Sequence, residues 1–261
     1  MSKFSLAITA FEETKDEVRI LDCIRPAQKH YAIDEIVIVD DHSSDFADLE
    51  TLLESEPKVK LSYNPKNLGV FGNKLEPVAQ CKNDWVINCD SDNLMDEEFL
   101  DLIVESPLDK ATWYCPSFAK PEFDYRSLIG AYVLEDMPWF MTQALSGCAM
   151  NTGNQTVHRE SYLEVFGQYR GKRTDLMMPN WLNLSEEDRK QHHWRLVFDA
   201  NDSFIFNMEW LSAGNTMCFL EGLEYEHYYT GGDESNYARA PVQKHDLNDC
   251  LVKELQVRVN T

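Results

Sequence analysis

Short apolar runs separated by polar turns dominate the first hundred residues of the chain. Strands are predicted at residues 4–10, 35–39, 59–63 and 85–89, and the runs at 4–10 and 35–39 are apolar enough to be buried. Continuous apolar character, without strict alternation, is typical of strands that are covered on both faces. The pattern therefore predicts strands in the interior of a layered protein.

Amphipathic segments with helical spacing separate the predicted strands. The first begins at Thr14 and Glu17, which have the T-x-x-E spacing of a capping box, and is expected to end near Pro26. Further helices are predicted at residues 46–53, 75–81 and 96–104, with a loop over 64–73. Strands that alternate with helices indicate an α/β fold with a mostly parallel, Rossmann-like central sheet flanked by helices.

The pattern is less regular after residue 105. Four prolines (107, 116, 121 and 138) interrupt aromatic-rich segments, and the elements still predicted are a strand and helix over 156–166, a helix over 202–213 and a strand over 216–227. We expect one domain over 1–261. Within it we expect a regular half at 1–105, a less regular half at 106–230 and a tail at 231–261.

Charge and cysteine usage narrow the class of protein. The formal net charge is −21, which would repel a nucleic-acid backbone, although one bound cation can reverse the local sign for a small anionic ligand. Seven cysteines form no C-x-x-C pair, so reduced core thiols are expected. Neither a signal peptide nor a transmembrane segment is indicated, which favours the cytoplasm and leaves a position at the membrane surface open.

Three polar clusters follow three of the apolar strands, at residues 9–13, 40–44 and 90–93. Parallel strands place their carboxyl ends on one edge of a sheet, so we expect these clusters to converge. The third cluster contains Asp90-Ser91-Asp92, whose oxygens suit a hard cation such as Mn²⁺ or Mg²⁺. Acidic turns and helix caps often produce the same tripeptide, so its place after a buried strand carries the argument.

Several motifs, taken in order, resemble the inverting family-two glycosyltransferases, which have the A-type (GT-A) fold. The segments SLAITAFEE, EIVIVDDHSSD, NPKNLGVFGNK and WVINCDSDN are similar to that family's first strand, Asp-Asp-x-Ser turn, Asn-x-Gly loop and D-x-D metal motif. Later, GNQTVHRES is similar to the segment ahead of the acceptor helix, and NDSFIFNMEWLSAG occupies the place of the catalytic helix. Asn201 stands there where the family usually has an acid.

The resemblance implies that residues 1–105 form a nucleotide-sugar-binding half and residues 106–230 an acceptor-binding half. The residues that it places around the nucleotide are Thr9, Ala10 and Phe11 at the base, Glu12 near the ribose, Asp40 at a uracil-type imide, Asp41 in the turn, Asn67 and Gly69 in the loop, and Asp90 and Ser91 near the diphosphate. Without the resemblance, Asp40 would be assigned to capping the next helix. Asn67 and Gly69 suit an ordinary turn equally well.

The resemblance also implies a cation and a base. Asp90 and Asp92 are the expected ligands of Mn²⁺ or Mg²⁺, and His227 is a candidate third ligand, with a hydrogen-bonded histidine at a wet strand end as the alternative. Asp202 is the candidate base and Asp199 the second choice. A plain N-cap is the alternative for Asp202.

Two further segments carry suggestive side chains. Arg170, Lys172 and Arg173 form a basic loop that could contact a diphosphate or an anionic acceptor, although a solvated loop explains them as well. Trp139 and Phe140 could stack on sugar rings, although core packing is the better explanation.

The predicted function is metal-dependent, inverting transfer of a sugar from a nucleoside-diphosphate sugar, of UDP type, to a carbohydrate or glycoconjugate hydroxyl, as in polysaccharide biosynthesis. A nucleotidyltransferase should have a Gly-rich, Arg-containing loop after the first strand, and a dinucleotide-dependent oxidoreductase should have G-x-G-x-x-G there. The chain has Ala10-Phe11-Glu12-Glu13 instead. A non-catalytic sugar-binding protein on the same fold remains as the alternative, and the oligomeric state is open.

Overall fold

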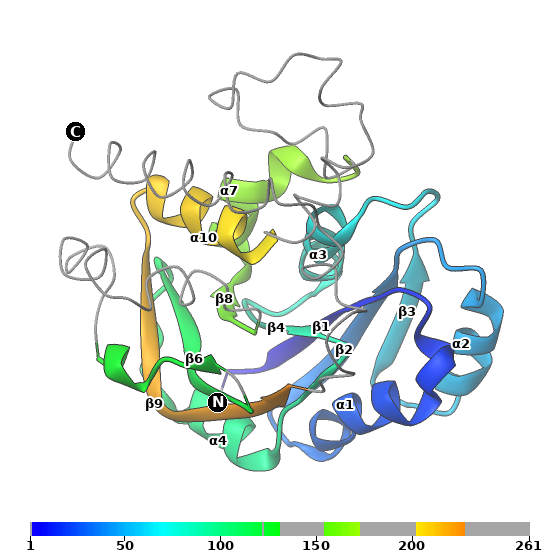
Figure 1. Ribbon diagram of the computed structural model, residues 1–261, viewed down its shortest axis with the longest axis horizontal. Coiled ribbons are helices and arrows are strands. Elements are labelled where there is room, and N and C mark those ends of the chain that lie inside the picture. Colours follow the sequence, from blue (N-terminus) through cyan, green and yellow to red (C-terminus); the bar gives the residue numbers. More distant parts are fainter. Residues whose placement is uncertain (1, 122, 131–153, 173–201, 228–261) are drawn as a thin grey trace.

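The computed structural model describes residues 2–121, 123–130, 154–172 and 202–227, and the strands in these residues form one curled sheet (Figure 1). The strands are β1 (Phe4–Ala10), β2 (Ile33–Asp40), β3 (Val59–Tyr63), β4 (Trp85–Asp90), β5 (Asn93–Leu94), β6 (Thr112–Lys120), β7 (Phe123–Asp124), β8 (Thr156–His158) and β9 (Thr216–His227). Their order is β3-β2-β1-β4-β8-β6-β9-β5, with β7 beside β6.

The first half of the sheet is parallel, as the alternation of strands and helices predicts. β1 lies between β2 and β4, and β3 pairs with the far side of β2. All four strands fall within a few residues of their predicted limits, so this part of the fold is confirmed.

The second half of the sheet contains a strand that the sequence pattern did not predict. β6 pairs in parallel with β9 and antiparallel with β8, which in turn pairs antiparallel with β4. Pro116 suggested an interruption here, but it lies inside β6, where the register with β9 shifts between Pro116 and Phe118. A proline is tolerated in a sheet at such an irregularity because the ladder is already broken there.

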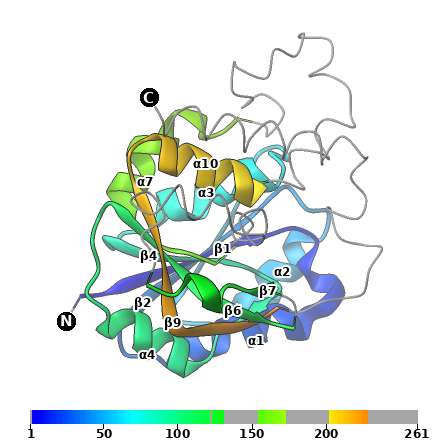
Figure 2. The same ribbon diagram turned by 60° about the vertical axis from the view of Figure 1, so that its left-hand side comes forward.

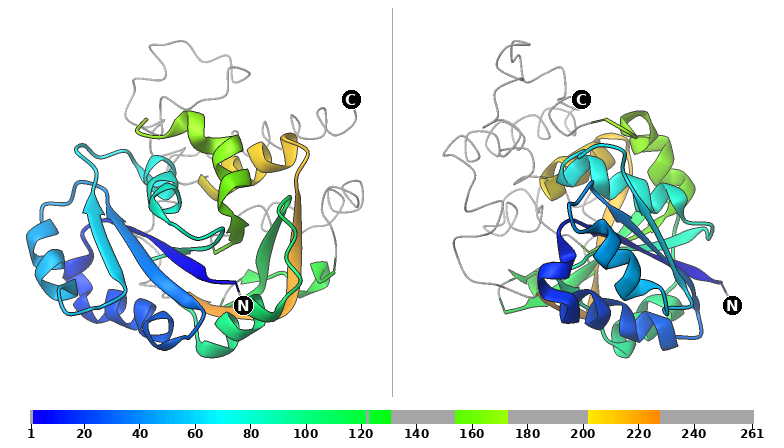
Figure 3. Two further views of the ribbon diagram at one scale, coloured as in Figure 1. Left: turned by 180° about the vertical axis from the view of Figure 1, so that it is seen from behind. Right: turned by 90° about the vertical axis from the view of Figure 1, so that its right-hand side faces the viewer.

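Helices cover both faces of the sheet, giving three layers (Figures 1 and 3). The helices on one face are α1 (Glu17–Lys29), α2 (Phe46–Leu53) and α4 (Glu97–Glu105), and those on the other are α3 (Val70–Gln80), α7 (Arg159–Phe166) and α10 (Asp202–Ser212). Three short 3₁₀ turns lie at Glu13–Asp16, Arg126–Leu128 and Gly167–Tyr169.

Alternating side chains of the strands divide the interior into two cores. Ile8 and Ile38 pack in the core with α1, α2 and α4, whereas Ala7, Val37 and Val39 pack in the core with α3, α7 and α10. The two faces differ because successive residues of a strand point to opposite sides of the sheet. Both cores are apolar, which explains why the strand segments read as continuous apolar runs.

Some predicted helix limits are wrong. Pro26 lies inside α1 and does not end it, and α3 begins at Val70, within the segment that was predicted as a loop. Thr14 does not cap α1 in the predicted way, because its hydroxyl and its amide both donate to the carboxylate of Asp45. The contact joins the end of β1 to the turn before α2.

Two expectations from composition can be compared with the structure. In the described part of the chain, the free and buried cysteines are Cys23, Cys81, Cys89, Cys115 and Cys218, which confirms the prediction of core thiols for these five. Within the same residues, no helix combines the length and the apolarity that crossing a bilayer requires.

Candidate functional site

Strand register brings the predicted polar clusters together. Thr9 pairs with Asp90 across β1 and β4, and Ala10 pairs with Asp40 across β1 and β2. The hydroxyl of Thr9 lies 3.4 Å from the carboxylate of Asp90. The clusters at the ends of β1, β2 and β4, the strands labelled in Figure 2, therefore converge at the carboxyl edge of the sheet.

Asp40 and Asp41 at the end of β2 are buried and engaged with the chain around them. The carboxylate of Asp40 accepts the amide of Ser43 at 2.8 Å and also its hydroxyl. The carboxylate of Asp41 accepts the amides of Leu68 at 2.7 Å and Gly69 at 2.8 Å. Asp40 thus orders its own turn, and Asp41 fixes the loop that leads into α3.

The Asn-x-Gly loop is held to β2 by the same contacts. The side-chain amide of Asn67 donates to the backbone carbonyl of Asp41 at 2.8 Å, and Gly69 precedes α3 with a φ of 84°. A positive φ of this size favours glycine because a side chain would clash with the backbone. The structure shows Asn67 and Gly69 as turn residues that hold α3 in place.

Glu13 joins the end of β1 to the D-x-D segment. Its buried carboxylate accepts the hydroxyl of Ser91 at 2.5 Å and the amide of Phe11 at 3.4 Å, and it pairs with Arg19 at 2.7 Å. Phe11 is 50% exposed, so its ring is available at the rim. Glu12 adopts a φ of 55°, which is uncommon for a residue other than glycine.

Asn154 supports the D-x-D segment from the adjoining part of the sheet. Its side-chain oxygen accepts the amide of Asp90 at 3.3 Å and the side-chain amide of Asn93 at 2.9 Å. Sequence reasoning did not assign this residue, although it lies in the GNQTVHRES segment that carries the resemblance. The available signal was its place just before the strand predicted at residue 156.

Lys74 of α3 is the main residue that sequence reasoning missed. Its side chain is only 6% exposed, and its ammonium nitrogen lies 3.0 Å from the carboxylate of Asp90 and 2.7 Å from that of Asp202. Burial by itself would lower the pKa of Lys74, but Asp202 and then Asp90 outweigh burial and raise the pKa above its ordinary value. Lys74 is therefore a buried cation that joins the D-x-D segment to the candidate base.

Asp202 is the first residue of α10, and its side chain is largely buried at 11% exposed. Tyr162 of α7 lies nearby, and burial together with the charge of Asp202 raises the pKa of this phenol well above its ordinary value. Asp202 lies on the side of the sheet that α3, α7 and α10 cover, and Lys74 links it to Asp90 at the carboxyl edge. Asp199, the second candidate, and Asn201 lie outside the described residues.

Asp92 and His227 meet at the end of the sheet. The carboxylate of Asp92 lies 3.9 Å from Nε2 of His227, and β5 next to Asp92 pairs with the end of β9 through Asn93 and His227. Burial and the neighbouring charge of Asp90 raise the pKa of Asp92 to about 6. A nearby divalent cation would favour the ionised carboxylate.

The side chains around Asp92 suit a cation that is also coordinated by a substrate. Across the described ranges, no group of three His, Cys, Asp or Glu side chains is close enough to hold a metal ion. Asp90 faces Lys74, which leaves Asp92 and His227 as the protein ligands that the geometry favours. Mg²⁺ and Mn²⁺ sites of this kind are completed by substrate phosphates and water.

The basic segment has a structural role in the part that is described. Arg170 pairs with Glu76 of α3 at 3.0 Å, and the amide of Gly171 donates to the same carboxylate at 2.9 Å. Lys172 lies over the ring of Tyr169. These contacts hold the end of α7 against α3. Arg173, Trp139 and Phe140 lie outside the described residues.

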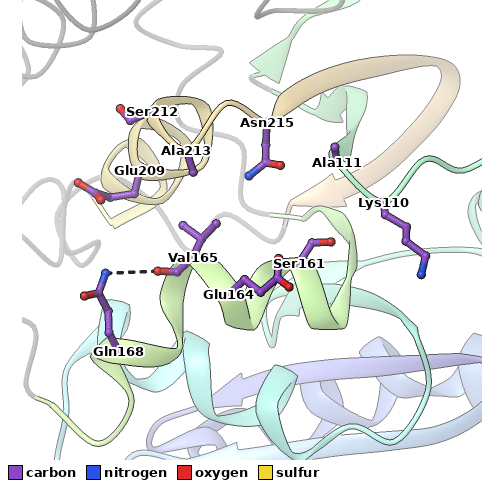
Figure 4. A pocket seen from close by; sticks show the side chains of 10 residues that line it. All are labelled: Lys110, Ala111, Ser161, Glu164, Val165, Gln168, Glu209, Ser212, Ala213 and Asn215. Carbon is purple, nitrogen blue, oxygen red and sulfur yellow. Dashed lines mark hydrogen bonds between the residues drawn. The ribbon is translucent and has the colours of Figure 1, made fainter.

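A hollow of about 620 Å³ lies between α7 and α10 (Figure 4). Lys110, Glu164 and Glu209 contribute to its polar lining, and none of the residues of the carboxylate edge does. It is therefore separate from the candidate site.

A curled, mostly parallel sheet between two helix layers, with acidic residues at its carboxyl edge, is the architecture of an A-type glycosyltransferase. The sequence pattern of the family described as "Glycosyl transferase family 2" matches residues 5–140. The chain belongs to this family.

Relatives and solved structures agree with this assignment. An uncharacterized glycosyltransferase of Rickettsia bellii is 34% identical over 97 residues, which is 37% of this chain and 31% of that protein. The crystal structure of S. aureus TarS 1–349 in complex with UDP-GlcNAc matches 98% of this chain and 66% of that chain, with 15% identity and a TM-score of 0.57. The same fragment in complex with UDP gives 14% identity and a TM-score of 0.54, over 98% of this chain and 71% of that one.

The lengths differ between this chain and its matches. This chain spans under a third of the curated relative and about two thirds of the TarS fragment. At 15% identity or less, the structural likeness establishes the fold.

Proposed function

We propose that the protein transfers a sugar from a nucleoside-diphosphate sugar, of UDP type, to a hydroxyl of a carbohydrate or glycoconjugate acceptor, with inversion at the anomeric carbon. The observation that carries the proposal is the position of Asp202 beside Asp90, joined to it by Lys74. In this arrangement Asp202 would act as a base beside the edge of the sheet that would bind the donor. TarS, which has the same fold, was solved with UDP-GlcNAc and with UDP.

Each residue has a defined part in the proposed reaction. A carboxylate oxygen of Asp202 accepts the proton of the acceptor hydroxyl. At the same time the acceptor oxygen forms a bond to the anomeric carbon, and the bond from that carbon to the nucleoside diphosphate breaks. The ring of Phe11 is exposed at the edge of the site, where the nucleobase of the donor can pack against it. One displacement with one base gives inverted configuration at the anomeric carbon.

A divalent cation fits the proposal. Mn²⁺ or Mg²⁺ held by Asp92 and His227 would neutralise charge that develops on the leaving diphosphate. The half-buried carboxylate of Asp92 and its raised pKa agree with a position where a positive charge is favourable.

The proposal predicts that binding of UDP requires both the cation and Asp92. Titration calorimetry of the wild type with UDP should show binding in Mn²⁺ that weakens at least about tenfold when Mn²⁺ is omitted or when Asp92→Ala is introduced, since ligand loss at such sites costs about that much or more. Glu98→Ala is the control, because Glu98 is an exposed acid on α4. If the affinity for UDP is the same with and without Mn²⁺ and in Asp92→Ala, the cation has no part in the proposed function.

Turnover separates an enzyme from a sugar-binding protein on the same fold. UDP-GlcNAc and other UDP-sugars are incubated with Mn²⁺ and a panel of acceptor sugars, and release of UDP is measured. A binding protein would take up the nucleotide without releasing UDP above background.

A further inference from the structure

Lys74 is buried between β4 and α10. It lies one turn after Phe71 on α3, and its side chain is 6% exposed. A buried ammonium is stable only when it is paired and hydrogen-bonded. Here the partners come from two distant parts of the chain, the end of β4 and the start of α10.

Packing between α3 and α10 fixes the position of the ion pair. Phe71 stacks on Phe206 with 4.0 Å between ring centroids. Residues three or four apart lie on the same face of a helix, so Phe71 and Lys74 share a face of α3, and Asp202 and Phe206 share a face of α10. The aromatic contact and the ion pair therefore lie one helical turn apart along the contact between α3 and α10.

A second contact holds α10 from the other side. The side-chain amide of Gln155 donates to Asn207 at 2.8 Å, and both side chains are buried. Gln155 precedes β8, which pairs with β4. The backbone of α10 is thus fixed relative to the strand that carries Asp90, and Lys74 fixes the side chain of Asp202.

Lys74 separates two carboxylates that would otherwise repel each other. Asp90 and Asp202 both lie within 3.0 Å of one ammonium nitrogen. In a site of low dielectric, two carboxylates that lose the cation between them move apart, or one of them takes up a proton. A neutral side chain at position 74 would release Asp202 from its place at the sheet edge.

We propose that Lys74 is a positioning residue for sugar transfer, which holds the carboxylate of Asp202 next to the donor-binding edge. The inference rests on the proposed function. Lys74 acts through Asp202 and Asp90, and its part is to keep the base at a fixed distance from the reacting centre. Displacement of a catalytic group by about 1 Å can cost on the order of 10²-fold in rate.

The test compares neutral and charged replacements. Lys74→Met should lower kcat by on the order of 10²-fold. The KM for UDP-sugar and the affinity for UDP with Mn²⁺ should change less than about fivefold, because Asp92 and His227 are untouched. Lys74→Arg keeps the cation and should recover at least about tenfold of the lost kcat. Lys82→Met is the control, because Lys82 is a half-exposed lysine paired with Asp34 on the surface.

Loss of folding is separated from loss of positioning. Thermal unfolding is recorded for each variant, and Lys74→Gln, which keeps a hydrogen-bond donor, replaces Lys74→Met if that variant does not fold. A residue that served stability alone would lower the melting temperature and leave the kcat of the folded protein near wild type.

The outcomes distinguish the two proposals. A folded neutral variant with kcat within about threefold of a turning-over wild type overturns the role of Lys74 and leaves the proposed function standing. A wild type that binds UDP and releases none from any UDP-sugar overturns the proposed function, and the role of Lys74 with it. A large fall in kcat, recovered by arginine, supports both.

Discussion

Asp202→Asn is expected to lower kcat by about 10²–10⁴-fold, the usual contribution of a general base. Asparagine keeps the size of the side chain and can still contact Lys74, but its amide does not accept the proton of the acceptor hydroxyl. UDP binding in Mn²⁺ should remain within a few-fold of wild type, because Asp92 and His227, the proposed ligands of the cation, are unchanged. The measurement is steady-state release of UDP, with calorimetry on the same protein.

Asp199→Asn serves as the matched comparison, because Asp199 is the other acid near the start of α10 in the sequence. It should retain most of the activity. The opposite result, in which Asp199→Asn is inactive and Asp202→Asn is active, would transfer the role of base to Asp199.

Asp41→Ala is expected to destabilise the fold by about 3–5 kcal/mol. The carboxylate accepts the amides of Leu68 and Gly69 and the side-chain amide of Asn64. Each buried donor left without a partner costs about 1–3 kcal/mol, and charged partners cost more. The loss should appear as a lower midpoint in urea unfolding with an unchanged slope.

Asp48→Ala is the control for this change, because Asp48 is an exposed acid in the first turn of α2. It should alter stability by less than about 0.5 kcal/mol. A loss for Asp41→Ala that is no larger than for Asp48→Ala would show that the loop before α3 does not depend on Asp41.

Sequence reasoning predicted the parts of the fold that rest on local patterns. β1, β2 and β4 are buried on both faces, so their apolar runs identify them from the sequence alone, whereas β3 is a partly exposed edge strand. The acidic edge follows from the same pattern, because parallel strands end on one side. The helices α7 and α10 and the strand β9 were also confirmed.

Other features depend on contacts that no local pattern reveals. β6 contains Pro116, which suggests a break until its irregular pairing with β9 is known. Lys74 resembles any charged residue on an amphipathic helix, and only the packing of α10 on α3 buries it between two acids. Arg170 suggested an anion site, and its actual partner, Glu76, lies far away in the sequence.

The parallel pairing of β6 with β9 also sets an order of events during synthesis. β1 to β4 all lie within the first 90 residues and pair with one another, whereas β6 at 112–120 waits for β9 at 216–227. Contacts between distant segments form slowly, and N-terminal parts fold first as the chain emerges from the ribosome. We therefore expect the carboxyl edge around Asp40 and Asp90 to assemble early, and Asp202 and His227 to join it only after the second half of the chain has been made.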